Sequence, residues 1–119
     1  MTRKWRLLPL AAAVCLAWPA EAPKDRKPPP WEKPLAAGRI LFRQNCSVCH
    51  EINKPESKKF GPSLFRLFQN EKTPLTGFPP TEEYVIAKIK TGGVVMPAFG
   101  SILTDDQISK ILAFVRSRH

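Results

Sequence analysis

The sequence predicts an all-α fold with short helices and long loops. Apolar residues recur at helical spacing in several short stretches, and no stretch alternates apolar and polar residues for long enough to indicate a sheet. With 119 residues the chain makes one small domain, in which the buried core is modest. Brief helices of this kind would bury too little surface unless something large and apolar filled the centre of the domain.

Residues 1–22 are predicted to be a secretory signal peptide. Basic residues between positions 3 and 6 precede an apolar run over residues 7–18, and Ala20-Glu21-Ala22 fits the small-x-small cleavage pattern. The run is shorter than the ~20 apolar residues that a membrane-spanning helix needs, which disfavours an uncleaved anchor. We therefore expect a mature chain that starts near Pro23, in the periplasm, with no stable membrane insertion.

Cleavage would also simplify the cysteine content. It removes Cys15 and leaves Cys46 and Cys49 as the only thiols. A lipid anchor on Cys15 is disfavoured because Val14 is bulky where lipoprotein signals carry a small residue. Three positive charges and one negative charge are lost with the signal, so the net charge falls from +9 to +7. This charge favours acidic partner proteins, whereas basic residues spread singly along the chain argue against nucleic acid.

Residues 23–34 are predicted to be a proline-rich basic arm or linker, and residues 35–119 form the globular domain. The prolines of "APKDRKPPPWEKP" forbid a regular helix and favour an extended chain of polyproline II type. Trp31 within this arm either docks on a partner or packs on the chain's own domain.

The first helix is predicted to start at Pro34, because proline suits the first helical position. Residues that recur at helical spacing up to the first cysteine are Leu35, Gly38, Leu41 and Phe42. A shorter helical piece is expected in "SLFRLFQ", residues 63–69.

Two further helices are marked by capping residues. Thr81 suits an N-cap, with acidic residues 82–83 in the first turn, and the helix should stop at Gly92. Thr104 and Gln107 form a capping box for the last helix. Apolar stripes on these two helices comprise Val85, Ile86 and Ile89, and Ile108, Ile111, Leu112 and Val115. Leu103 and Ile108 are expected to form a hydrophobic staple, with Arg116 and Arg118 at the negative end of the last helix.

The pentapeptide "CSVCH" at residues 46–50 is compatible with three kinds of site. Tetrahedral zinc sites usually add a second, distant pair of cysteines or histidines, which this chain lacks. A thioredoxin-like dithiol needs a βαβ context, which the predicted helices do not provide. Covalent haem is favoured: Cys46 and Cys49 add to the vinyl groups of the porphyrin, and His50 turns under the ring to ligate iron. A haem would also supply the apolar centre that short helices need.

From about Leu35 to Arg118 the chain resembles a class I c-type cytochrome. The motifs "CSVCH", "GPSL", "MPAF" and "LTDDQISKILAFVRS" occur in the order found in that family. The resemblance implies the class I fold, in which short helices and loops wrap around one covalently attached haem c.

Met96 is predicted to be the second axial ligand of the iron. Two strong ligands suit an electron carrier, because an unchanged coordination shell keeps reorganisation small. Met1 leaves with the signal, and Met96 lies in a constrained loop before Pro97, unlike a helix face. The methionine of the family's "MP" loop ligates iron, which assigns the role to Met96. The alternatives are that Met96 fills a gap in the core, or that His119, at the chain terminus, ligates instead.

The pair Gly61-Pro62 is predicted to support His50. A ligating histidine normally donates its other ring N–H to a backbone acceptor, and in similar cytochromes the carbonyl of this proline accepts it. Gly61 would permit close approach of the backbone to the haem, and an ordinary turn is the alternative. Glu51 departs from the family, in which glycine is common at this position. Because of this residue and the lysine-bearing loop that follows it, the sequence does not fix the backbone conformation after the CSVCH turn.

The first and last helices are expected to cross as they do in the family. Gly38 and Phe42 would meet Phe114, with the small residue allowing close packing of the aromatic side chain. Side chains expected to line the haem, or else to form plain core, are Leu64, Tyr84 and Phe99.

The predicted function is that of a periplasmic one-electron carrier with no enzymatic activity. Lysines expected to orient acidic redox partners are Lys58, Lys59, Lys88 and Lys90. One alternative is a haem protein with a displaceable sixth ligand, such as a peroxidase or a gas sensor. The other is a dedicated electron-accepting subunit of a periplasmic dehydrogenase or oxidase, with the proline-rich arm at the interface.

Overall fold

The computed structural model describes residue 30 and residues 32–119. The predicted signal peptide at residues 1–22, with Cys15, lies outside the described residues, as do most of the arm and Trp31. The helical elements in chain order are α1 (Glu32–Asn45), the 3₁₀ helix η1 (Leu67–Gln69), α2 (Glu82–Thr91) and α3 (Asp105–Arg116). The described residues contain no strand, which confirms the all-α prediction.

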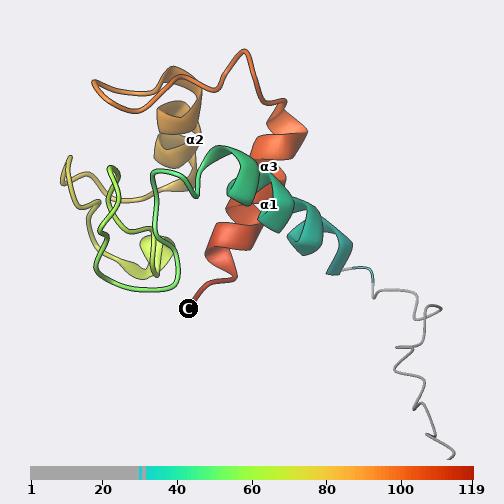
Figure 1. Cartoon of the computed structure of the whole chain (residues 1–119), viewed down its shortest axis with the longest axis horizontal. Coiled ribbons are helices and arrows are strands. Elements are labelled where there is room, and N and C mark those ends of the chain that lie inside the picture. The colour runs from blue at the N-terminus through green and yellow to red at the C-terminus, as the bar shows by residue number, and fades with distance from the viewer. Residues whose placement is uncertain (1–29, 31) are drawn as a thin grey trace, which may run out of the picture.

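The centre of the fold is the crossing of α1 and α3, which Figure 1 shows near the middle of both helices. A Cβ on Gly38 would lie 2.0 Å from the carbonyl oxygen of Lys110 and 3.0 Å from the Cβ of Phe114. The absence of a side chain therefore lets the two backbones touch. The rings of Phe42 and Phe114 pack beside this contact with their centroids 5.6 Å apart. The predicted crossing is confirmed.

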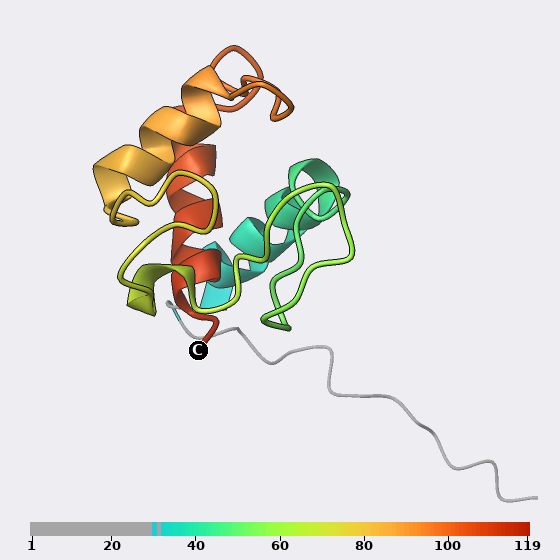
Figure 2. The ribbon, with the colours of Figure 1, turned by 90° about the vertical axis from the view of Figure 1, so that its left-hand side faces the viewer.

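A single apolar core forms around this crossing. Its buried members are Phe42, Ile52, Leu67, Leu103, Ile108, Ile111, Leu112, Phe114 and Val115. Five of them come from α3, because their spacing places them on one face of that helix. The predicted stripe of α2 packs against the core from outside and stays only partly buried. Figure 2 shows α2 alongside α3, with α1 on the other side of α3.

Two helix boundaries differ from the sequence prediction. α1 begins at Glu32 rather than Pro34. Proline is tolerated anywhere in the first turn, where its missing N–H has no helical partner, so Pro34 does not mark the start. In residues 63–69 only η1 is helical, because Arg66 adopts a left-handed backbone conformation with φ of 53° and interrupts any longer helix.

The predicted caps of α2 and α3 are present. The hydroxyl of Thr81 accepts a hydrogen bond from the N–H of Tyr84 at 3.2 Å. Thr104 and Gln107 form the reciprocal capping box, with bonds of 2.9 and 3.2 Å. Arg116 lies in the last turn of α3, as predicted, and it also reaches Glu82 on α2 at 2.8 Å. That ion pair ties the two helices together. Among the described residues, no helix has the length and apolar character that crossing a membrane requires.

Candidate cofactor site

The six predicted site residues line the same cavity. It measures about 370 Å³ and lies among α1, α2, α3 and the connecting loops. The residues that the structure brings together there are Cys46, Cys49, His50, Gly61, Pro62 and Met96. Most of the remaining lining is apolar, so this is a dry site with a few chemically distinctive groups.

The CSVCH turn is a direct continuation of α1. The N–H of Cys46 donates to the carbonyl of Phe42 at 2.8 Å, and the N–H of His50 donates to the carbonyl of Cys46 at 2.9 Å. This single turn directs both thiols into the cavity. The two cysteines are free thiols. Burial, with a smaller contribution from the neighbouring Cys49, raises the pKa of Cys46 to about 11, so its thiol is protonated at neutral pH.

His50 is oriented by one hydrogen bond to the backbone. Its Nδ1 lies 2.8 Å from the carbonyl oxygen of Pro62. A carbonyl only accepts, so Nδ1 carries the proton and the lone pair is on Nε2. Gly61 makes this geometry possible, because a Cβ there would lie 2.6 Å from Cε1 of His50. The arrangement matches the predicted support of a metal-ligating histidine.

The segment that precedes Gly61 holds the same turn from outside. The ammonium of Lys59 donates to the carbonyl of Ser47 at 2.5 Å and to the carbonyl of His50 at 3.1 Å. The N–H of Gly61 donates to the carbonyl of Cys49 at 2.7 Å. Residues 59–62 therefore bind three carbonyls and the imidazole of one short turn. The sequence predicted only that Lys59 faces partners, because nothing in the lysine-bearing loop indicates which ammonium group folds back.

Met96 is positioned by a loop that is tied to the end of α2. The N–H of Gly93 donates to the carbonyl of Met96 at 2.9 Å, and the N–H of Phe99 donates to the carbonyl of Ile89 at 2.9 Å. Gly92 has φ of 70°, and a Cβ there would lie 2.4 Å from the carbonyl oxygen of Met96. Only glycine meets both conditions. Met96 is half-buried at the wall of the cavity.

Glu51, the departure from the family pattern, organises the backbone after the turn. Its Oε1 accepts hydrogen bonds from the N–H of Ile52 at 2.8 Å and of Asn53 at 3.0 Å. These bonds, that from Asn53 first, lower the pKa of the carboxyl below its usual value. The carboxylate of Glu51 thus fixes the backbone of the next two residues, which a glycine has no side chain to do.

Residues 33–115 match the family model described as cytochrome C oxidase, cbb3-type, subunit III. The cytochrome c6 of Diacronema lutheri is 30% identical over 84 residues, which cover 71% of this chain and 95% of that protein. This chain belongs to the class I c-type cytochromes.

Two further cytochromes c6 are similar to this chain. The cytochrome c6 of Leptolyngbya boryana is 33% identical over 85 residues, which cover 67% of this cytochrome and 87% of that protein. The crystal structure of cytochrome c6 from the diatom Phaeodactylum tricornutum superposes with a TM-score of 0.54 at 29% identity, covering 70% of this chain and 91% of that one. The predicted family and class I fold are confirmed.

The residues of the cavity fit the cofactor of this family, one covalently bound haem c. The cavity volume lies within the ~300–1,000 Å³ that is usual for cofactor sites. Two free thiols, an imidazole with its lone pair on Nε2 and a thioether face an apolar interior, as covalent attachment and axial ligation require. The cytochrome is thus an electron-transfer protein and not an enzyme.

The other side chains expected near the haem, Leu64, Tyr84 and Phe99, also line the cavity. The wall formed by residues 73–76 was not predicted from the sequence. In that wall the hydroxyl of Thr76 lies 2.6 Å from the hydroxyl of Tyr84 and 2.6 Å from that of Thr73. The sequence pattern was uninformative here, because a stretch with prolines and a glycine is typical of any surface turn.

The alternatives to haem find no support in the geometry. In residues 30 and 32–119, no three side chains of the His, Cys, Asp and Glu types gather as ligands for a metal ion, which disfavours zinc. His119 is exposed and is not part of the cavity lining, so the bis-histidine alternative lacks its second ligand.

Proposed function

We propose that this cytochrome is an exported carrier of single electrons, with its haem attached through Cys46 and Cys49 and ligated by His50 and Met96. The observation that carries the proposal is the convergence of these four side chains on one apolar cavity. Haem c supplies the one-electron chemistry when bound. The chain's own residues hold it, orient its ligands and keep water away.

The contribution of the chain is rigidity around the ligands. The hydrogen bond from Nδ1 to the Pro62 carbonyl fixes the imidazole plane and makes Nε2 a stronger donor. The bonds around Gly92 and Phe99 hold the Met96 loop against α2. A ligand set that stays in place through oxidation and reduction keeps the reorganisation cost of electron transfer low.

Exposed apolar side chains offer a contact surface for redox partners. Val48 lies within the CSVCH turn and is 73% exposed, while Val94 and Val95 at the cavity wall are 105% and 82% exposed. Val94 and Val95 are consecutive, and contiguous exposed apolar residues are typical of an interaction site. A small contact area of this kind suits a short-lived complex.

Lysine side chains would steer acidic partners. Lys90 is paired with Asp105 at 2.6 Å, so its charge is partly compensated. Within the described part of the chain, no carboxylate lies within 4.0 Å of Lys58 or Lys88, so the charges of these two lysines are uncompensated. The association rate with an acidic redox partner should therefore fall steeply with added salt, and a salt-independent rate would contradict the steering.

The ligand assignment is tested by visible and near-infrared spectra of the protein expressed with a haem-attachment system. We expect covalent haem with an iron–sulfur charge-transfer band in the wild type and in the control His119→Ala. The band should be absent in Met96→Ala. A colourless wild-type product without stoichiometric iron would refute the proposal, and a band that survives in Met96→Ala would refute the ligand.

Export and the domain division belong to the same proposal. Residues 1–22 would be removed as a signal. The predicted arm of residues 23–34 overlaps α1, which begins at Glu32, so residues 23–31 would remain as an arm and residues 32–119 would form the haem domain. The N-terminal mass of protein recovered from the periplasm measures this directly. Cleavage elsewhere than after Ala22, or recovery of the full chain with the membrane fraction, would contradict the division.

A second candidate is a dedicated electron-accepting subunit of a periplasmic dehydrogenase or oxidase. It is favoured by the match to a family model that is described as an oxidase subunit. Affinity purification from the native host distinguishes the two functions. A stable complex that is lost when residues 23–31 are deleted would support the subunit, and recovery of the free cytochrome would support the carrier.

A further inference from the structure

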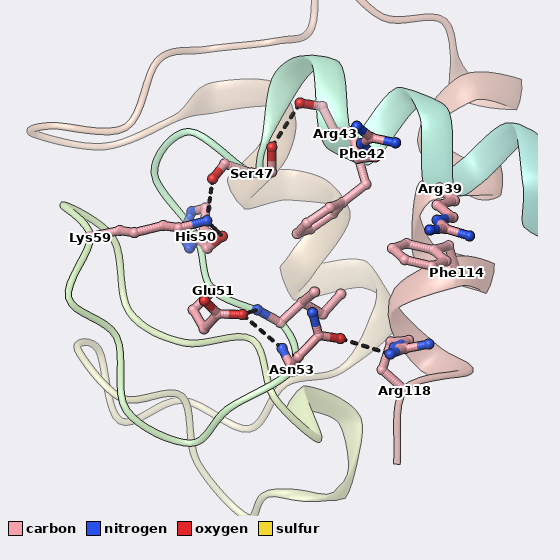
Figure 3. Close-up of a pocket in the computed structure, with 11 residues that line it drawn as sticks. Arg39, Phe42, Arg43, Ser47, His50, Glu51, Asn53, Lys59, Phe114 and Arg118 are labelled. Carbon is pink, nitrogen blue, oxygen red and sulfur yellow. Dashed lines mark hydrogen bonds between the residues drawn. The ribbon is translucent and has the colours of Figure 1, made fainter.

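A second cavity lies outside the haem site and is polar. It measures about 400 Å³ and is bounded by α1, the segment that follows the CSVCH turn and the end of α3. Phe42 and His50 line both cavities, so the two are separated by the turn itself. Figure 3 shows this second cavity with its lining side chains.

Positive charge dominates the lining of this cavity. Among the described residues, its cationic lining is Arg39, Arg43, Lys59 and Arg118, and Glu51 is its one acidic residue. In Figure 3, Arg39 and Arg43 extend from α1 and Arg118 from the end of α3, while Lys59 approaches from the opposite side of the view. The carboxylate of Glu51 is engaged by the backbone N–H groups of Ile52 and Asn53. Three elements distant in sequence thus bring an excess of positive charge to one concave site.

Two of these cations are held in place by the protein. Arg118 donates to the side-chain carbonyl of Asn53 at 2.7 Å, and its guanidinium lies 5.8 Å from the centre of the Phe114 ring. Lys59 is held by the carbonyls of the CSVCH turn. Fixed donors bind an anion with little loss of side-chain entropy.

The other two cations have no described acidic partner. In the part of the chain that the structure describes, no carboxylate lies within 4.0 Å of Arg39 or Arg43. They are four residues apart on α1, so their side chains are neighbours on the helix surface. Like charges at this spacing destabilise a helix slightly, and an anion between them would remove that cost.

We propose that this cavity binds a phosphoryl group. Guanidinium forks match the geometry of phosphate oxygens and form bidentate charge-assisted hydrogen bonds with them. Arg39 and Arg43 make these bonds, and Arg118 and Lys59 add positive charge from the other sides. The rings of Phe42 and Phe114 supply an apolar wall for the organic part of a phosphate ester. The site goes beyond the proposed function, since electron transfer does not require it.

Anion binding at this site would change the reduction potential of the haem iron. His50 lines both cavities, so a dianion in the second cavity lies on the other side of the ligand that holds the metal. Nearby negative charge favours the ferric state and lowers the reduction potential. A tenfold preference of the anion for the ferric protein corresponds to a shift of about 59 mV. This coupling rests on the proposed function, whereas binding itself does not.

The experiment is calorimetric titration of the haem-loaded protein with inorganic phosphate and with pyrophosphate, at constant ionic strength against chloride. We expect binding in the wild type, weakened at least roughly tenfold in Arg39→Gln/Arg43→Gln. Glutamine keeps the helix propensity of α1, so the fold is retained. The control Lys72→Gln removes one exposed charge elsewhere and should bind as the wild type does. Equal affinity in the wild type and the double variant, or no binding beyond chloride, would overturn the proposal.

A second arm identifies the source of the phosphoryl group. Sedimentation with phosphatidylcholine vesicles, with and without phosphatidic acid, is compared for the same variants. Recovery with phosphatidic acid vesicles that is lost in Arg39→Gln/Arg43→Gln but kept in Lys72→Gln would assign the group to a lipid. Binding of pyrophosphate without vesicle recovery would assign it to a free phosphate ester. Calorimetry needs no electron transfer, so a failure of the carrier function leaves this result readable.

Discussion

Gly38→Ala sets two effects of one methyl group against each other. In an exposed helix alanine is more favourable than glycine by about 0.8–1.0 kcal/mol. At this position the new Cβ would lie 2.0 Å from the carbonyl oxygen and 2.7 Å from the carbonyl carbon of Lys110. Carbon atoms ordinarily approach to about 3.5–4.0 Å, so α1 and α3 would have to separate by roughly 1 Å or more.

The packing cost should exceed the gain in helix propensity. Overpacking costs about 1–3 kcal/mol when side chains adjust, and here the obstacle is backbone, which cannot rotate away. Separation of the helices would also loosen the contact between the Phe42 and Phe114 rings. Taking the upper end of the cost, we expect a net loss of about 2 kcal/mol in the free energy of unfolding.

Urea unfolding of the haem-loaded protein, followed by far-ultraviolet circular dichroism, measures this loss. The control is Ser109→Ala, which changes an exposed position of α3 and should alter stability by no more than about 0.5 kcal/mol. If Gly38→Ala were as stable as the wild type or more so, the close backbone contact would be wrong, because propensity alone predicts stabilisation.

Three further substitutions test the surroundings of the site. Gly61→Ala would place a Cβ 2.6 Å from Cε1 of His50; we expect a lower yield of covalent haem, and a wild-type yield with an unchanged spectrum would contradict the contact. Lys59→Gln removes a positive charge bound to the CSVCH turn, so the reduction potential measured by redox titration should fall. The control Lys58→Gln, at the exposed neighbouring residue, should shift the potential less. Equal shifts would count against the contact of Lys59 with the turn. Thr104→Ala removes the cap of α3 and should cost about 1 kcal/mol in urea unfolding, with Thr104→Ser restoring most of it; no loss in the alanine variant would show that the cap is unimportant.

The sequence predicted helix ends correctly where the capping interaction lies within one turn. The capping box of Thr104 and Gln107 and the N-cap at Thr81 formed as predicted, because each needs only residues within one turn. The start of α1 was wrong by two residues, since a first-turn proline leaves several start positions open. The helix expected in residues 63–69 shrank to η1, because the left-handed conformation of Arg66 is imposed by the surrounding fold and not by its residue type.

The site residues of the cavity were predictable from the sequence, whereas the contacts that surround and support them were not. Cys46, Cys49 and His50 lie within five residues of the chain and need only a turn to act together. The return of Lys59 to the carbonyls of that turn depends on how a loop folds back. The same is true of the wall formed by residues 73–76, which a one-dimensional pattern does not mark.

By itself, the sequence determined the helical class and the thiols and imidazole of the CSVCH turn, and it predicted Met96 as the second ligand, because these follow from residue type and short-range spacing. Only the tertiary structure decided which tautomer His50 adopts, which lysine braces the turn and that Arg39, Arg43 and Arg118 meet in one cavity. The physical reason is separation along the chain. Contacts between α1, the loops and the end of α3 are fixed by packing around the Gly38 crossing, and no local pattern records that packing.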